Sequence, residues 1–155
     1  MQERWNADMK VVIVGGVAGG ATAAARIRRL NEQAEIVVFE RSGYISYANC
    51  GLPYYIGDVI TDPEELTLQT PESFFSRFRI MMKVLHEVTA IHHDRKTVSV
   101  RNLKTGEEFE EGYDKLILSP GAKPTQPKLS GMEADKLFTL RTVEDTFKIK
   151  AYINN

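Results

Sequence analysis

The sequence predicts an α/β fold in which a parallel sheet carries a nucleotide-binding turn. Residues 11–14 (Val-Val-Ile-Val) form a short apolar run that is typical of a buried parallel strand. A glycine-rich stretch over residues 15–20 predicts a sharp turn, and the alanine-rich run over residues 21–30 favours a helix. Residues 36–40 (Ile-Val-Val-Phe-Glu) indicate a second buried strand. Strand, turn, helix and strand together predict a Rossmann-like βαβ unit.

The glycine turn is the first candidate binding site. A turn that runs directly into a helix can hold a diphosphate, because backbone N–H groups and the positive end of the helix dipole point at the anion. In the dinucleotide pattern, glycine is expected at three positions. Gly15 and Gly20 occupy the first and the third, whereas Val17 departs from the pattern at the second.

Glu40 is the acid that this pattern requires. It follows Gly20 by 20 positions, the spacing expected of a carboxylate that binds ribose hydroxyl groups. A carboxylate there also disfavours a 2′-phosphate, so the ligand should contain an unphosphorylated ADP. The alternative is an ordinary βαβ unit with a surface glutamate.

Composition limits the class of protein. A chain of 155 residues, 43% of them hydrophobic, predicts one domain with one core. The net charge of -1 argues against a generally basic nucleic-acid binder. A single cysteine excludes an internal disulfide framework and a cysteine-based zinc site. No apolar run is long enough to span a bilayer, so we expect a soluble, cytoplasmic protein, with residues 1–9 as an extension before the fold.

The first helix is expected to end near Asn31 and to bury one of two neighbouring stripes. Residues at core spacing predict the buried stripe, namely Ala23, Ile27 and Leu30. The second stripe is polar and basic, and consists of Thr22, Arg26 and Arg29. Its simplest interpretation is a solvated helix face.

The remaining elements follow in order. Asp62-Pro63 and Thr70-Pro71 each predict a capped helical start. Residues 84–91, 97–101 and 107–111 predict a small antiparallel meander, inserted before another short buried strand at residues 116–118. A tight turn at residues 119–122, a short strand at residues 138–140 and a helix over residues 143–155 complete the chain.

Cys50 is the candidate nucleophile. A lone cysteine in a cytosolic chain is often only a small buried hydrophobic residue. Here Asn49 and Gly51 flank it, and it is expected to open a short helix through Pro53 and Ile56. A helix N-terminus stabilises a thiolate and lowers the pKa of the thiol, which would make the sulfur of Cys50 nucleophilic near neutral pH.

These motifs resemble the single-cysteine branch of the flavin-dependent pyridine nucleotide–disulfide oxidoreductases. Within it, the chain is most similar to coenzyme A-disulfide reductases and to NAD(P)H-dependent CoA-persulfide or polysulfide reductases. The resemblance runs from about residue 10 to the end of the chain. Its most specific stretches are residues 14–22, 46–54, 68–74 and 113–121. Val17 belongs to this branch's version of the glycine turn.

The resemblance implies a fold, a cofactor and the residues that hold it. The fold would be a Rossmann-like FAD-binding βαβ domain, and residues 10–155 would be the first segment of a discontinuous FAD-binding domain. Glu40 would bind the ribose, Arg41 would lie near the adenine and Val88 would line the adenine site. The remaining FAD contacts would come from the glycine turn and the later tight turn, namely Gly15, Gly16, Val17, Ala18, Gly19, Gly20, Ser119, Pro120 and Gly121.

The resemblance also implies the chemistry. Cys50 would cycle between a thiolate and a mixed disulfide with CoA, while Ser46 and Asn49 position its sulfur. Ser46 stands where the two-cysteine class of the same superfamily has its second cysteine. Thr22, Arg26 and Arg29 would contact CoA, because guanidinium groups suit phosphate recognition. NAD(P)H would be the reductant in a homodimeric parent enzyme.

Several alternatives stay open. Phe78 replaces a lysine that can contact CoA, so a CoA persulfide or polysulfide is as acceptable a substrate as CoA disulfide. An NADH oxidase or peroxidase, with a cysteine sulfenic acid at Cys50, is the alternative enzyme, and a nucleotide- or CoA-binding module is the alternative outside catalysis. The reductant can be NADH or NADPH. The parent enzyme can also exist with or without a C-terminal rhodanese-like domain.

Two further expectations concern what the 155 residues lack. Compared with the family, they lack the NAD(P)H-binding domain and the dimerisation domain, so we expect a truncated fragment that is inactive alone. We expect no metal site, because His92 and His93 are adjacent on a strand and therefore face opposite sides.

Overall fold

The computed structural model describes residues 9–125, 129–130 and 137–155. They form two units: residues up to 46 with residues 69–120, and residues 47–68 with residues 121–155. Of the expected extension, residues 1–8 lie outside the described residues. Met9 does not belong to it, because this residue is only 5% exposed and lies in the core of the first unit. No helix in the described part of the chain is both long and apolar enough to cross a membrane.

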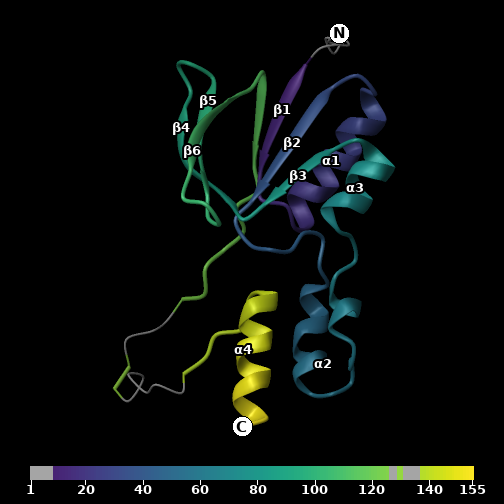
Figure 1. Ribbon diagram of the computed structural model, residues 1–155, viewed down its shortest axis with the longest axis vertical. Helices are drawn as coiled ribbons and strands as arrows, with labels where there is room; N and C mark the ends of the chain where they lie inside the picture. The colour runs from purple at the N-terminus through teal and green to yellow at the C-terminus, as the bar shows by residue number, and fades with distance from the viewer. Residues whose placement is uncertain (1–8, 126–128, 131–136) are drawn as a thin grey trace. The chain divides into compact units, whose positions relative to one another are not determined.

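A four-stranded parallel sheet organises the first unit (Figure 1). Its strands are β1 (Lys10–Val14), β2 (Glu35–Glu40), β3 (Met81–Val84) and β7 (Lys115–Leu118), in the order β3-β2-β1-β7. β1 lies in the middle, where Val12 pairs with Val37 on one side and with Leu116 on the other. The βαβ unit and the parallel sheet predicted from the sequence are therefore confirmed.

Both faces of this sheet are covered, which explains why its strands are apolar without alternation. Successive strand residues point to opposite faces. Val11, Ile13, Ile36 and Val38 pack with helices α1 (Ala18–Leu30) and α3 (Pro71–Phe78). Val12, Val37 and Phe39 pack with Val98 and Val100 on the other face. The second cluster joins the parallel sheet to the antiparallel sheet of β4 (His86–His92), β5 (Thr97–Asn102) and β6 (Glu108–Gly112).

The meander is confirmed, but its first boundary was wrong. Val84 was expected to begin the antiparallel meander, whereas it ends β3, where it pairs in parallel with Glu40. Leu85 separates the two sheets, with a positive φ of 56° and a hydrogen bond from its N–H to the carbonyl oxygen of Ser42. This single left-handed residue turns a continuous β-favouring run into two strands of different sheets.

The buried face of α1 is also rotated from the expected one. Of the expected stripe, Ile27 is buried and Ala23 packs against the core, but Leu30 is 52% exposed. The buried residues are mostly small, namely Gly20, Ala21, Ala24, Ala25 and Ile27. Glycine and alanine allow the helix to approach the sheet closely, so small side chains rather than leucine mark the inward face.

The second unit consists of short helices. The 3-10 helix η1 (Asn49–Gly51) runs into α2 (Leu52–Ile56), and η2 (Pro63–Leu66) follows the Asp62 cap as expected. Helix α4 (Val143–Ile153) confirms the predicted C-terminal helix and starts with a capping box at Thr142. The strand expected at residues 138–140 is absent from the described residues, where residues 137–140 have no regular structure.

Candidate functional site

The glycine turn after β1 is so tightly packed that two positions exclude any side chain. Gly15 has a φ of +96°, and a β-carbon there would collide with the carbonyl oxygen of Ser119. A β-carbon on Gly20 would collide with the carbonyl oxygen of Gly15. The N–H of Ser119 in turn donates to the carbonyl oxygen of Val14 at 2.8 Å. The turn is therefore held between the start of α1 and the end of β7.

The N-terminus of α1 differs from those of the other long helices. Val17 occupies the cap position without a side-chain hydrogen bond, and the first turn contains no acidic residue. By contrast, α3 and α4 begin with capping boxes. The first turn of α3 contains Glu72, and the first turn of α4 contains Glu144 and Asp145. An uncapped N-terminus without nearby carboxylates leaves the positive end of the helix dipole available to an anion.

Glu40 connects the second strand to the glycine turn. Its carboxylate accepts hydrogen bonds from the N–H of Gly16 and from the N–H of Ser42, both at 2.8 Å. The side chain lies at the end of β2, and the residue is only 7% exposed. A carboxylate has about four lone-pair sites. Glu40 can therefore hold the turn and still accept hydrogen bonds from a hydroxyl-bearing ligand.

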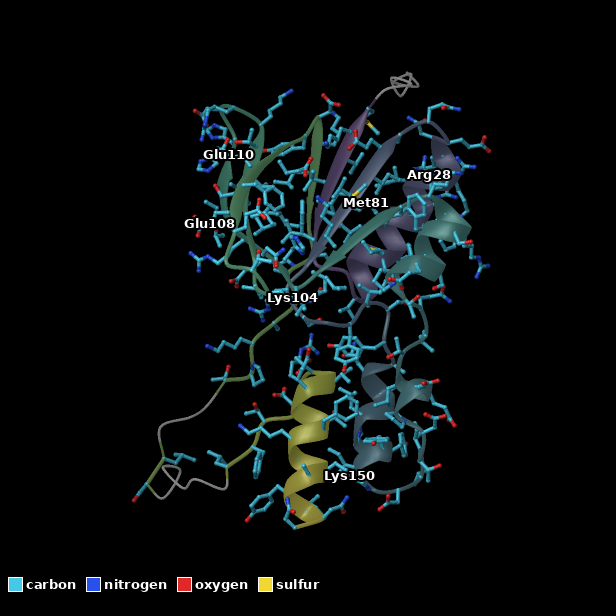
Figure 2. All side chains as sticks on the ribbon, viewed as in Figure 1. Arg28, Met81, Lys104, Glu108, Glu110 and Lys150 are labelled. Carbon is cyan, nitrogen blue, oxygen red and sulfur yellow. The ribbon has the colours of Figure 1, made fainter. Side chains whose placement is uncertain are left out.

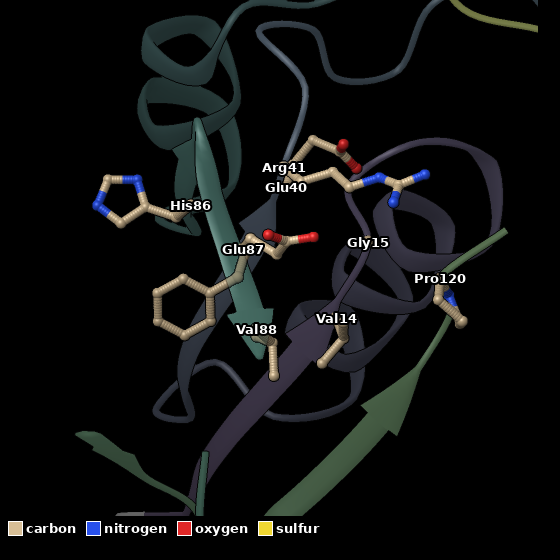
Figure 3. A pocket seen from close by; sticks show the side chains of 9 residues that line it. Val14, Gly15, Glu40, Arg41, His86, Glu87, Val88 and Pro120 are labelled. Atoms are coloured by element: carbon tan, nitrogen blue, oxygen red, sulfur yellow. The ribbon is translucent and has the colours of Figure 1, made fainter. Parts of the chain in front are cut away.

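A pocket of about 120 Å³ opens beside these residues (Figure 3). The structure brings together at this pocket five residues that the sequence had marked as cofactor-binding candidates, namely Gly15, Glu40, Arg41, Val88 and Pro120. Val14 and Phe39 supply apolar surface. An apolar wall beside a buried carboxylate and an arginine fits an adenosine group, whose base is flat and whose ribose carries hydroxyl groups.

His86 and Glu87 also line the pocket, although neither was predicted from the sequence to bind a ligand. They directly precede Val88 on β4, so their position beside that residue was the available signal. The Nδ1 atom of His86 lies 2.7 Å from the carbonyl oxygen of Val84, and its ring contacts Phe109 edge-on. These contacts fix the start of β4 at the rim of the pocket.

The other candidates around the turn are placed in different ways. Ser119 lies against Gly19, where its hydroxyl occupies the space that a β-carbon would need. Gly121 belongs to the second unit and has a positive φ of 72°. Ser46 ends the first of the two segments that form the first unit, and its N–H donates to the carbonyl oxygen of Gly16 at 3.2 Å.

Cys50 lies in the second unit and is exposed, as is its neighbour Asn49. It occupies the middle of η1, directly before α2, rather than the first turn of one continuous helix. Gly51 is buried against Ile60 and Leu66, and the N–H of Ala48 donates to the carbonyl oxygen of Leu66. The thiol is thus presented at the surface on a backbone that is packed from behind.

The three arginines of α1 have two different environments. Arg26 and Arg29 are exposed together with Thr22, and neither guanidinium forms an ion pair with any described residue. Arg28 instead donates to the carbonyl oxygens of Phe78 and Arg79, at 2.8 Å and 3.0 Å (labelled in Figure 2). Burial, followed by repulsion from Arg79, lowers the pKa of the Arg28 guanidinium. Arg28 is structural, whereas Arg26 and Arg29 are available to a ligand.

The contacts of Phe78 explain why a phenylalanine stands where the family pattern has a lysine. Its ring packs on Phe74, with the ring centroids 5.0 Å apart, and contacts the main core of the first unit. The guanidinium of Arg77 lies 5.1 Å from the centroid of the Phe78 ring. Position 78 therefore supports α3. Among the described residues, no cluster of histidine, cysteine and acidic side chains could hold a metal ion.

The fold and the turn together define a Rossmann-like dinucleotide-binding domain of the oxidoreductase type. The profile of the pyridine nucleotide-disulphide oxidoreductase family matches residues 9–154, and the chain belongs to this family. The family depends on FAD and NAD(P)H.

Individual relatives are similar over most of the chain. A coenzyme A disulfide reductase of Staphylococcus aureus is 52% identical over 144 residues, covering 93% of this chain and 32% of the relative. The crystal structure of reduced Bacillus anthracis CoADR-RHD has a TM-score of 0.94 at 55% identity, over 99% of this chain and 28% of that chain. A NAD-dependent persulfide reductase from A. fulgidus has a TM-score of 0.87 at 36% identity, over 94% of this chain and 27% of that chain. The chain therefore spans about a third of the length of the curated relative.

Proposed function

We propose that this chain supplies the FAD-binding and thiol-bearing part of an NAD(P)H-dependent reductase of CoA disulfide or CoA persulfide. The observation that carries the proposal is the basic face of α1. Arg26 and Arg29 are exposed, point away from the buried face and have no acidic partner among the described residues. The Nε of Arg29 donates to the carbonyl oxygen of Ala25 on the same helix, at 3.2 Å. Guanidinium groups without an acidic partner beside Thr22 suit a substrate that carries several phosphates, as CoA does.

The pocket of the first unit fits the adenosine end of FAD. Glu40 would accept the ribose hydroxyl groups, Val88 and Val14 would contact the adenine, and Arg41 would lie at its edge. The glycine turn and the uncapped start of α1 would receive the diphosphate. When bound, FAD would supply the relay that takes a hydride equivalent from the nicotinamide and delivers an electron pair to a disulfide.

Cys50 would perform the covalent step. Its thiolate attacks one sulfur of CoA disulfide, the bond between the two CoA sulfurs breaks, and one CoA leaves as a thiolate. The product is a mixed disulfide between Cys50 and the second CoA. Two electrons and one proton, supplied by NAD(P)H, then regenerate the Cys50 thiolate and release CoA thiol. With a CoA persulfide, the same exchange releases sulfide instead.

We extend the proposal to a cytoplasmic parent enzyme that acts as a homodimer. Ser46 and Asn49 would position the sulfur of Cys50 and the pantetheine end of the substrate. Reduction of oxygen or peroxide through a sulfenic acid at Cys50 is the competing chemistry, and it needs no phosphate-binding arginines.

The rate at which Cys50 reacts with CoA disulfide tests the proposal. Cys50 is the only thiol of the chain, so loss of free thiol reports on it alone. We expect the R26M/R29M double variant to lower this rate constant about tenfold, equivalent to about 1.4 kcal/mol of lost recognition. The matched control is R95M/R101M, which removes two exposed arginines that pair with Glu110 and Glu108 instead. The control should leave the rate unchanged.

Two results would contradict the proposal. The first is an R26M/R29M variant that reacts with CoA disulfide as fast as the wild type. The second is a wild-type thiol that hydrogen peroxide oxidises faster than CoA disulfide does, with no dependence on the two arginines. The second result would favour the oxygen or peroxide chemistry.

A further inference from the structure

Helix α4 anchors the end of the helix that follows Cys50. The ammonium group of Lys150 donates to the carbonyl oxygen of Ile56 at 3.0 Å and to the carboxylate of Asp58 at 2.5 Å. The Lys150 side chain is only 13% exposed, and all three residues belong to the second unit (Lys150 is labelled in Figure 2). More than 90 residues of sequence separate the two sides of this contact.

The contact lies where α2 needs support. A helix of five residues is too short to be stable by itself, because nucleation costs more than so few hydrogen bonds return. The last carbonyl groups of a helix also lack partners within the helix. Lys150 supplies a cation and a donor at this negative end, which is Ile56. Two residues later, Asp58 has a left-handed backbone with a φ of 59°.

Aromatic contacts reinforce the same junction. The ring of Tyr55 in α2 meets the ring of Phe147 in α4 edge-on, with the centroids 5.7 Å apart. The ammonium nitrogen of Lys150 lies 5.8 Å from the centroid of the Tyr55 ring. The carboxyl end of α2 is thus fixed to α4 by a polar bond and a ring contact.

The other end of α2 carries the thiol. Cys50 and Gly51 immediately precede Leu52, the first residue of α2, and Leu52 is buried. The N–H of Gly51 donates to the carbonyl oxygen of Ala48 at 2.9 Å, and Gly51 packs on Leu66. A shift of α2 along its axis must therefore move the backbone that presents the thiol.

We propose that Lys150 is a positioning residue for Cys50, which it holds in place through α2. This inference rests on the proposed role of Cys50 as the thiol that exchanges with a disulfide. Lys150 does not touch the reacting sulfur. It fixes the far end of the short helix, so that the sulfur meets a large disulfide in one orientation.

The test compares two reagents and three variants in the 155-residue chain. CoA disulfide demands a defined approach to the thiol, whereas iodoacetamide is small and demands little. We expect K150M to lower the rate constant with CoA disulfide about tenfold, since an ångström of misplacement can cost more than that. The rate constant with iodoacetamide should change by less than about twofold, because a small reagent needs no particular orientation. K150R, which keeps a positive charge and hydrogen-bond donors at the carboxyl end of α2, should restore most of the loss.

The matched control is K148M. Lys148 lies on the same helix and carries the same charge, but its ammonium group lies near the ring of Phe138 rather than α2. K148M should leave both rate constants unchanged. Amide hydrogen exchange gives an independent measure, and K150M should accelerate exchange over residues 52–57 without changing β1 and β2.

Three outcomes would overturn the inference. An unchanged reaction of K150M with CoA disulfide is the first. An equal loss with both reagents is the second, because it would mean that Lys150 serves only the stability of the unit. Unchanged hydrogen exchange over residues 52–57 is the third. If wild-type Cys50 reacts no faster with CoA disulfide than with oxidised glutathione, the proposed function fails, and hydrogen exchange still decides whether Lys150 fixes α2.

Discussion

The buried carboxylate of Glu40 accepts a hydrogen bond from the backbone N–H of Gly16, 24 residues earlier in the chain. This bond ties the end of β2 to the turn that follows β1, and a second bond from the N–H of Ser42 fixes the other carboxylate oxygen. The residue that the sequence marks as the ribose acid is therefore also part of the framework of the turn.

Replacing Glu40 should weaken adenosine nucleotide binding more than a lost ribose contact alone would. In E40Q, a neutral amide replaces a charged acceptor, and its NH₂ group cannot accept the second N–H. Hydrogen bonds to charged groups contribute about 1.5–3 kcal/mol, so we expect at least a tenfold weaker affinity for ADP or FAD by calorimetry. E35Q, at the exposed start of the same strand, is the control and should bind normally. Equal affinities of E40Q and wild type would contradict the assignment.

Adding one methyl group at Gly15 should disrupt the turn. The β-carbon of G15A would collide with the carbonyl oxygen of Ser119, and alanine disfavours a φ of +96°. We expect a loss of about 2 kcal/mol or more in the free energy of unfolding, measured by urea denaturation. In G112A, by contrast, the new β-carbon meets no atom within 4 Å. A G15A chain as stable as G112A would show that the turn can relax.

Arg28 should contribute to the stability of the fold, whereas the exposed Arg26 should not. R28M leaves the carbonyl oxygens of Phe78 and Arg79 without their donor at the end of α3, and we expect a loss of about 1–3 kcal/mol in stability. R26M removes an exposed arginine without an ion pair among the described residues and should change stability by less than about 0.5 kcal/mol. Thermal unfolding of the two variants measures the difference. If R26M destabilises the chain as much as R28M, the division between a structural and an exposed arginine is wrong.

Lys10 should contribute stability that disappears only at strongly alkaline pH. Burial lowers the pKa of its ammonium group, but Glu111 and Glu35, at 2.6 Å and 2.8 Å, outweigh burial and raise the pKa above its ordinary value of 10.5. A group whose pKa is higher in the folded state stabilises the fold below its unfolded pKa, and this stability is lost as pH rises through the folded pKa. The difference in unfolding free energy between wild type and K10M should therefore be constant from about pH 7 to 9 and shrink above about pH 11. A difference that shrinks already between pH 7 and 9 would contradict this assignment.

The sequence was most informative where structure depends on local pattern. The run Val11 to Val14, the glycine turn and Glu40 predict a strand, a turn and a second strand, because each signal lies within its own element. The same is true of the caps at Asp62 and Thr70, whose side chains accept from a backbone N–H two and three residues later, respectively.

The sequence-based predictions were wrong where tertiary contacts determine the local structure. Leu30 has core spacing, yet the sheet selects the alanine face of α1, because close packing favours small residues there. Leu85 continues a β-favouring run, yet its positive φ divides that run between two sheets. The bonds of Arg28 to Phe78 and of Lys150 to Asp58 join residues 50 or more positions apart, and no local pattern reveals such pairs.

The intact mass of the protein tests the central proposal most directly. After incubation with CoA disulfide and removal of excess reagent, we expect the chain to gain the mass of one CoA. A thiol reductant should remove this adduct completely, and C50S should never acquire it, because Cys50 is the only cysteine. Two results would contradict the assignment of Cys50 as the thiol that exchanges with CoA disulfide. One is a wild-type chain that gains no CoA, and the other is an equal gain of CoA by wild type and C50S.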